Sequence, residues 1–152
     1  MEAINLKELF SVTLILFSVI DILGAIPFIL DIKKKFKVLD ALKITLVSGI
    51  LLYSFLFIGE SILDLFGVDV KSFAVTGGII MFFLGLEMVL NIEIFKHDPQ
   101  LSYTSPIVPL AFPLIAGAGS MTTLISLNSQ YARINIIFGV LLNLIFVYGV
   151  LK

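Results

Sequence analysis

The strongest constraint on this sequence is the spacing of its charged residues, which leaves five apolar stretches of roughly 20 residues. A helix needs about 20 mainly apolar residues to cross roughly 30 Å of hydrocarbon, so each stretch predicts one membrane span. Regular alternation of apolar and polar residues is absent, so the predicted spans are helices and not barrel strands. The predicted spans are residues 9–30, 44–59 (extending to 66), 72–86 (extending to 90), 106–127 and 134–151.

The composition supports a membrane protein and excludes several other classes. Hydrophobic residues make up 59% of the 152 residues and charged residues 14%, against about 45–50% and 25% in soluble domains. A globule of this size buries only about 70% of its surface, so the excess apolar side chains face lipid. We therefore exclude a soluble enzyme, a disordered protein and a disulfide-stapled domain. The net charge of −1 gives no general attraction to nucleic acid.

No motif in the sequence points to an enzyme. The sequence has no cysteine, no His-Glu-x-x-His motif, no P-loop and no dinucleotide fingerprint. Ser120 follows a glycine, but no glycine follows it in the nucleophile pattern and no span supplies a histidine base. We therefore expect neither catalysis nor a resident cofactor or metal.

The distribution of cations predicts the orientation of the chain. The N-terminal segment is acidic and lacks a cleavage site, so it is read as a membrane helix and not as a signal peptide. Most lysines fall on the side of residues 31–43, which places that loop in the cytoplasm and the N-terminus outside. The alternative is that this lysine cluster binds anionic lipid. The predicted cytoplasmic cations are Lys33, Lys34, Lys35, Lys37, Lys43, Lys96 and Lys152, and the outer ones are Lys7, Lys71 and Arg133.

The first predicted span contains residues that interrupt a helix. Asp21, Gly24 and Pro27 lie at mid-span. Pro27 has no amide hydrogen, so the Leu23 carbonyl is expected to lose its helical partner. An ionisable group at this depth usually has a function. Asp21 is therefore a candidate to bind a substrate ammonium group, to couple a proton or to coordinate a cation. The alternative is a neutral Asp21 bonded to a neighbouring helix.

The fourth predicted span is interrupted as well. Pro109 and Pro113 precede a Gly-Ala-Gly segment at residues 117–119. This pattern predicts a half-helix, an unwound Gly-Ala-Gly segment, and a second half-helix that starts near Ser120. The amides of that new N-terminus, with the positive end of the dipole, suit a carboxylate. Ordinary kinks are the alternative, since Gly and Pro are common in membrane helices.

Interruptions in spans one and four suggest inverted repeats, because an odd number of crossings separates the two segments. Broken segments at matching positions of inverted halves mark the midplane site of many transporters. We expect a single membrane domain, residues 1–152. Its first repeat covers about 8–90 and its second about 105–152.

Two segments resemble signatures of the MarC family of prokaryotic membrane proteins. Residues 21–28 (DILGAIPF) resemble its first-helix signature and residues 109–122 (PLAFPLIAGAGSMT) its fourth-helix signature. The resemblance implies an all-α polytopic protein of six helices in two inverted three-helix repeats, with helices 1 and 4 discontinuous. A sixth helix is then expected to be missing after Lys152. Ile22 and Ala118 replace prolines that are usual in the family, which suggests shallower unwinding.

The resemblance also implies a function. The expected protein is an inner-membrane transporter of small neutral amino acids of the glycine and alanine class, with a proton or sodium as candidate coupling ion. A homo-oligomer is compatible with it, and a nucleic-acid partner is not expected. A non-transporting scaffold or subunit and a passive channel are the alternatives. The candidate substrate-binding residues are Asp21, Gly24, Pro27, Gly117, Ala118, Gly119, Ser120 and Thr122.

Other small and polar residues are assigned to packing or to the membrane surface. Asn135, Gly139 and Asn143 recur every four residues and predict a close-packed helix face. Gly77 or Gly78, together with Gly85, predicts a second such face. The remaining charged candidates, expected near the water interface, are Glu60, Asp64, Glu87 and His97.

Overall fold

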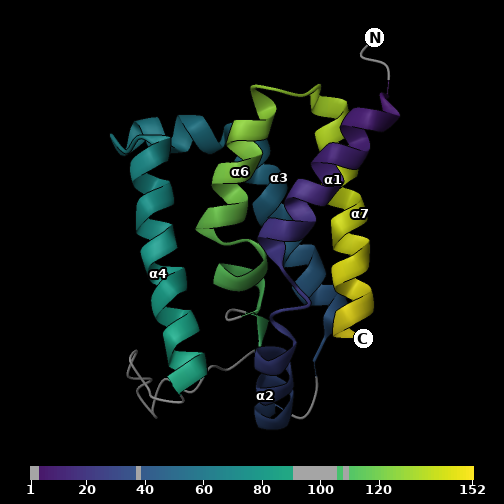
Figure 1. The fold of residues 1–152 in the computed structure, drawn as a ribbon, viewed down its shortest axis with the longest axis vertical. Coiled ribbons are helices and arrows are strands. Elements are labelled where there is room, and N and C mark those ends of the chain that lie inside the picture. Colours follow the sequence, from purple (N-terminus) through teal and green to yellow (C-terminus); the bar gives the residue numbers. More distant parts are fainter. Residues whose placement is uncertain (1–3, 37–38, 91–105, 108–109) are drawn as a thin grey trace.

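The computed structural model describes residues 4–36, 39–90, 106–107 and 110–152, and all regular structure in these ranges is helical (Figure 1). Lys37, Lys96, His97 and Pro109, which the sequence analysis singled out, lie outside them. The helices are α1 (Leu6–Ile20), α2 (Ile26–Phe36), α3 (Ala41–Leu65), α4 (Val70–Leu90), the π-helical turn η2 (Leu110–Ile115), α6 (Ala118–Asn128) and α7 (Arg133–Leu151).

The helices run between two ends of the molecule (Figure 1). The end of α2, the start of α3 and the end of α7 lie at one end. The start of α1, the start of α4 and the start of α7 lie at the other. The fold therefore separates the lysine-rich end of α2, with Lys33, Lys34 and Lys35, from the cations at the starts of α1, α4 and α7.

Three helices are long and apolar enough to cross a membrane: Ala41–Leu65, Val70–Glu87 within α4, and Arg133–Leu151. They correspond to the second, third and fifth predicted spans. The first predicted span is divided between α1 and α2, and the described part of the fourth between η2 and α6. Each piece is too short to cross the hydrocarbon alone, since about 20 residues are needed.

Helices α1 and α7 form a tight seam. Asn143 Nδ2 donates to the carbonyl oxygen of Thr13 at 3.1 Å. A side chain at Gly139 would meet Val12 Cγ1 at 2.7 Å, so glycine is what allows the helices to approach this closely. Asn135 Nδ2 donates to Glu8 Oε2 at 2.7 Å. The predicted packing face of α7 is confirmed.

Helix α3 lies at the centre of the bundle. Asp40 caps its N-terminus by accepting from the Lys43 amide at 3.1 Å. Its buried residues recur at helical spacing, as expected for a helix with neighbours along one face. These residues include Ile44, Ser48, Leu52, Leu56 and Leu63.

Helix α4 lies at the outside of the bundle and contacts α6. A Cβ at Gly77 would overlap the Cβ of Ala118, whereas among the described residues no atom lies within 4 Å of the corresponding position at Gly78 or Gly85. The predicted packing role is therefore confirmed for Gly77, and that of Gly85 stays a prediction. Much of the outer surface carries large apolar side chains, such as Val89 at 82% exposure, which suits contact with lipid.

Candidate functional site

The first break lies at Asp21. Helix α1 ends at Ile20, and the Asp21 amide donates to the Phe17 carbonyl at 3.1 Å. Asp21 then adopts left-handed backbone angles, φ 42° and ψ 48°. Aspartate tolerates this region better than most side chains. The sequence had assigned the departure from helical geometry to Gly24, but Gly24 is not among the residues with positive φ.

Local hydrogen bonds hold the turn after the break. Asp21 Oδ1 accepts from the Gly24 amide at 3.2 Å, and a Cβ at Gly24 would collide with this carboxylate. The Leu23 carbonyl accepts from the Ile26 amide at 3.2 Å. The Leu23 carbonyl has thus lost the helical partner at Pro27, as predicted, and is bonded by the preceding amide instead of being left free. Pro27 lies in the first turn of α2, where its missing amide has no helical partner to lose.

The second break lies between η2 and α6. The turn η2 contains Pro113, and Phe112 before it is extended, with φ −139° and ψ 129°. Gly117 is the N-cap of α6, with φ −88° and ψ 175° and no side-chain cap. Helix α6 thus begins at Ala118, two residues before Ser120. Of the predicted unwound Gly-Ala-Gly segment, only Gly117 is outside the helix, so that prediction is wrong in extent.

Two hydroxyl groups brace the start of α6. Ser120, which is 2% exposed, donates from Oγ to the carbonyls of Ile115 at 2.9 Å and Gly117 at 3.0 Å. Thr122 Oγ1 donates to the Ala118 carbonyl at 2.8 Å. The Ser120 hydroxyl thereby gives a donor to the Ile115 carbonyl on the far side of the break, while the Gly117 carbonyl also accepts from the Met121 amide. Ser120 therefore holds the second break in shape.

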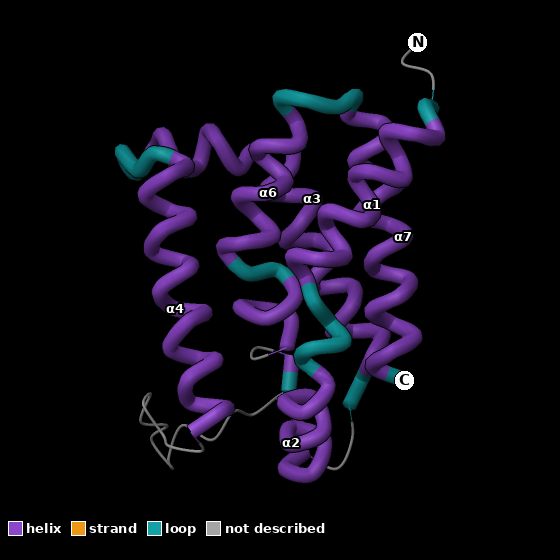
Figure 2. Tube along the Cα trace, viewed as in Figure 1, coloured by secondary structure: helices purple, strands orange, loops and turns teal. Residues whose placement is uncertain are grey.

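The two breaks are brought together. The Cβ position of Gly119 lies 3.6 Å from Val19 Cγ1, two residues before Asp21. On its other side, the start of α6 packs against α4 through Ala118 and Gly77. Figure 2 shows the loop that follows α1 and the loop that precedes α6 near the middle of the molecule. The end of one half-helix and the beginning of another thus meet inside the bundle.

The predicted site residues differ in burial. Gly117 and Ser120 are buried, and Ala118, Gly119 and Thr122 are half-buried. The three from the first break, Asp21, Gly24 and Pro27, are exposed.

The start of α6 is electropositive because it is a helix N-terminus with free backbone amides. Its first backbone bond joins the Met121 amide to the Gly117 carbonyl at 3.0 Å. The amides of Ala118, Gly119 and Ser120 precede that bond and carry the positive end of the helix dipole.

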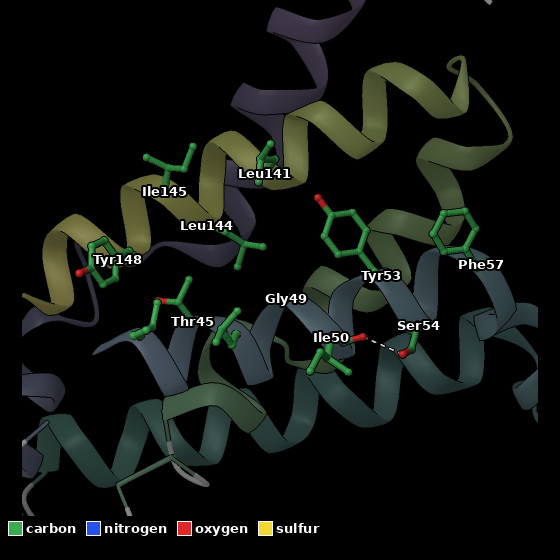
Figure 3. A pocket seen from close by; sticks show the side chains of 12 residues that line it. Thr45, Gly49, Ile50, Tyr53, Ser54, Phe57, Leu141, Leu144, Ile145 and Tyr148 are labelled. Atoms are coloured by element: carbon green, nitrogen blue, oxygen red, sulfur yellow. Dashed lines mark hydrogen bonds between the residues drawn. The ribbon is translucent and has the colours of Figure 1, made fainter. Parts of the chain in front are cut away.

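A groove that the sequence analysis did not predict lies between α3 and α7 (Figure 3). It is open on one side and has a volume of about 660 Å³. Gly49 on α3 faces Leu144 of α7 across the groove, and a Cβ added at Gly49 would lie 3.0 Å from Leu144 Cδ1. The other lining residues are Leu42, Thr45, Leu46, Ile50, Tyr53, Ser54, Phe57, Leu141, Ile145 and Tyr148.

Comparison with known proteins gives one family. Residues 6–152 match the family described as MarC family integral membrane protein. A UPF0056 membrane protein of Buchnera aphidicola (subsp. Acyrthosiphon pisum) is 30% identical over 130 residues, which cover 83% of this chain and 66% of that protein. The UPF0056 membrane protein YhcE of Escherichia coli (strain K12) is 30% identical over 82% of this chain and 63% of its own length.

An archaeal relative extends the comparison. A UPF0056 membrane protein of Pyrococcus abyssi is 32% identical over 71% of this chain and 57% of its own length. The chain thus spans less than two thirds of the length of these relatives. No solved structure matches the chain.

Proposed function

This chain belongs to the MarC family of integral membrane proteins, and from that premise we propose that it transports a small neutral amino acid of the glycine or alanine class. The observation that carries the proposal is the proximity of the two breaks, where the Cβ position of Gly119 in the first turn of α6 lies 3.6 Å from Val19 Cγ1 at the end of α1. Transporters commonly bind substrate at such paired discontinuities, where helix termini replace water around the charged groups.

The chemistry of the two termini suits the two charges of an amino acid. The amides of Ala118, Gly119 and Ser120 offer donors to a carboxylate at the positive end of α6. The C-terminal carbonyls of α1, with the Asp21 carboxylate next to them, offer acceptors to an ammonium group or to a coupling proton or sodium ion.

Ser120 has a supporting role in this proposal. Its hydroxyl hydrogen is directed at two backbone carbonyls. The Thr122 hydroxyl similarly donates to the carbonyls of Ala118 and Gly119 within α6. Both residues therefore fix the backbone amides in position, and substrate contacts come from the main chain.

The proposal includes an architecture and an orientation. The α1–α2 and η2–α6 pairs each count as one interrupted span, which gives five spans of a six-helix arrangement with two inverted repeats. The end of the molecule with the lysine-rich end of α2 faces the cytoplasm of a prokaryotic cell, and the start of α1 faces outside. The protein then resides in the inner or plasma membrane.

Uptake by proteoliposomes tests the function. Full-length protein is reconstituted, and entry of labelled glycine or alanine is measured against empty vesicles over a range of concentrations. We expect saturable uptake. A signal equal to that of empty vesicles across a panel of small amino acids would contradict the substrate class, and flux that never saturates would indicate a channel.

Two glycine variants separate a transporter from a scaffold. Gly119→Val places a branched side chain against Val19 at the junction of the breaks, whereas Gly149→Val places it in open space on α7. A transport site predicts loss of uptake for Gly119→Val alone, with normal insertion of both variants. A scaffold predicts that assembly fails and that no uptake exists to lose. Asp21→Asn is expected to change the rate or the pH dependence, and unchanged uptake would remove Asp21 from the site.

A further inference from the structure

Apolar side chains make up most of the lining of the groove between α3 and α7, although four hydroxyl residues, Thr45, Tyr53, Ser54 and Tyr148, also line it (Figure 3). Tyr53 Oη donates across the groove floor to the Ile137 carbonyl of α7 at 3.0 Å. Ser54 Oγ donates to the Ile50 carbonyl of its own helix at 2.7 Å. Thr45 Oγ1 is buried and has no hydrogen-bond partner among the described residues. An occupant of this surface is therefore apolar along most of its length.

A cation stands at one end of the groove. The guanidinium carbon of Arg133 lies 5.8 Å from the ring centroid of Phe57, a lining residue. Arg133 Nε donates to Asn128 Oδ1 at 3.2 Å. Arg133 is exposed, and it forms no ion pair with a carboxylate in the part of the chain that the structure describes. A guanidinium has five N–H donors, so several remain directed at the medium.

We propose that this groove binds an anionic phospholipid, with one acyl chain between α3 and α7 and the phosphate on Arg133. Arginine suits phosphate oxygens because its planar donors form two parallel hydrogen bonds. Arg133 is the first residue of α7, so it lies where a membrane-spanning helix leaves the hydrocarbon. A lipid headgroup lies at the same depth, and its chains run along the helix from there.

The groove is long enough to hold the part of an acyl chain that lies in one leaflet. From Leu42 to Phe57 the groove follows α3 for about 22 Å, at 1.5 Å per residue. Half of the hydrocarbon core is about 15 Å. An acyl chain that starts at Phe57 can therefore lie in the groove past Tyr53 and Gly49 without leaving it. This inference is independent of transport and uses no residue of the proposed substrate site.

A lipid is favoured over a second copy of the chain by the cation. An apolar helix from another copy would fill the groove but would leave the Arg133 charge at the membrane boundary without an anion. A phospholipid supplies the apolar chain and the anion in one molecule.

Native mass spectrometry of the full-length protein in mild detergent tests the proposal. Phosphatidylglycerol and phosphatidylcholine with the same acyl chains are added in equal amounts, and the retained lipid is counted. We expect the wild type to retain at least fivefold more phosphatidylglycerol. Arg133→Gln should remove this preference, whereas Lys71→Gln, which removes a cation at the same end of the molecule, should keep it.

Filling the groove gives a second, separate readout. Ser54→Phe places a ring in the groove, and Ser18→Phe places one on the exposed face of α1; both serines bond only within their own helix. Ser54→Phe should lower retention of both lipids at least fivefold, and Ser18→Phe should not. If circular dichroism shows that Ser54→Phe loses helicity, Ile145→Trp fills the same groove from α7 and carries the same expectation.

Three results would overturn the proposal. Equal retention of the two lipids by the wild type would contradict recognition of an anionic headgroup. An unchanged preference in Arg133→Gln would show that Arg133 does not bind the phosphate. Conversion of a dimer to a monomer by Ser54→Phe, with lipid retention unchanged, would make the groove an interface between copies.

Discussion

The contact between α4 and α6 predicts opposite effects for two neighbouring substitutions. Gly77 faces Ala118, and a Cβ added there would occupy the space of the Ala118 Cβ. Gly78, one residue further, has no atom within 4 Å of the same position. Both glycines are inside α4, so alanine improves helix propensity equally at each, by about 1 kcal/mol.

The difference between Gly77→Ala and Gly78→Ala therefore measures the steric term alone. The added methyl group at Gly77 also meets the Cα of Ala118 at 3.3 Å, which is backbone and cannot rotate away. Overpacking of this kind costs about 1–3 kcal/mol. Gly78→Ala should then stabilise the protein by about 1 kcal/mol. We expect Gly77→Ala to be less stable than Gly78→Ala by about 1–3 kcal/mol.

Denaturant unfolding in mild detergent, followed by circular dichroism, gives the two free energies of unfolding. The double variant Gly77→Ala with Ala118→Gly removes the colliding methyl group and should recover most of the loss, since contacting residues couple. Equal stability of the two single variants, within about 0.5 kcal/mol, or no coupling in the double variant, would refute the contact between α4 and α6.

Three further predictions use the same assay. Asp21→Gly should be more stable than Asp21→Ala by about 1 kcal/mol, because only glycine adopts positive φ without strain, and the reverse order would contradict the left-handed break. Asn143→Ala should cost about 1 kcal/mol through the lost bond to the Thr13 carbonyl, and no change would contradict the α1–α7 seam. The Ser72 hydroxyl and amide hold the pKa of the Asp69 carboxyl below its ordinary value of 3.8, so its stabilising effect is present above that pH and is lost as the pH falls below it. Asp69→Asn should flatten the dependence of stability on pH below about 4, and equal slopes would contradict this capping role.

The positions of the two breaks could be predicted from the sequence because their causes are local. Prolines and glycines near residues 21–27 and 113–119 remove amide donors and side chains from a helical stretch wherever the chain packs. The apolar lengths of α3, α4 and α7 are local as well, and these helices begin and end within a few residues of the predicted spans.

The details inside each break depend on neighbours and could not be predicted. The left-handed residue is Asp21 and not Gly24, because the Asp21 carboxylate accepts from the Gly24 amide and occupies the space above it. Helix α6 starts at Ala118, where the Met121 amide bonds the Gly117 carbonyl and the Ser120 hydroxyl reaches the Ile115 carbonyl across the break.

The groove between α3 and α7 was beyond sequence reasoning for another reason. Its existence depends on the separation of two helices that are far apart in the chain. Gly49 is only a weak indication of a groove in the sequence, because a glycine on a helix predicts close packing as readily as a gap.

The contacts of α1 divide the molecule into parts that differ in how easily they slide. Hydrogen bonds from Asn135 and Asn143 fasten α1 to α7 along its length. Within the described residues, no hydrogen bond joins α1 to α6, and the two helices meet by packing, where the Cβ position of Gly119 lies 3.6 Å from Val19 Cγ1. A displacement that separates the end of α1 from the start of α6 therefore moves α1 and α7 together as one rigid body. Apolar packing opposes that movement, and packed surfaces can slide past each other gradually. No hydrogen bond between the described residues of α1 and α6 has to break first.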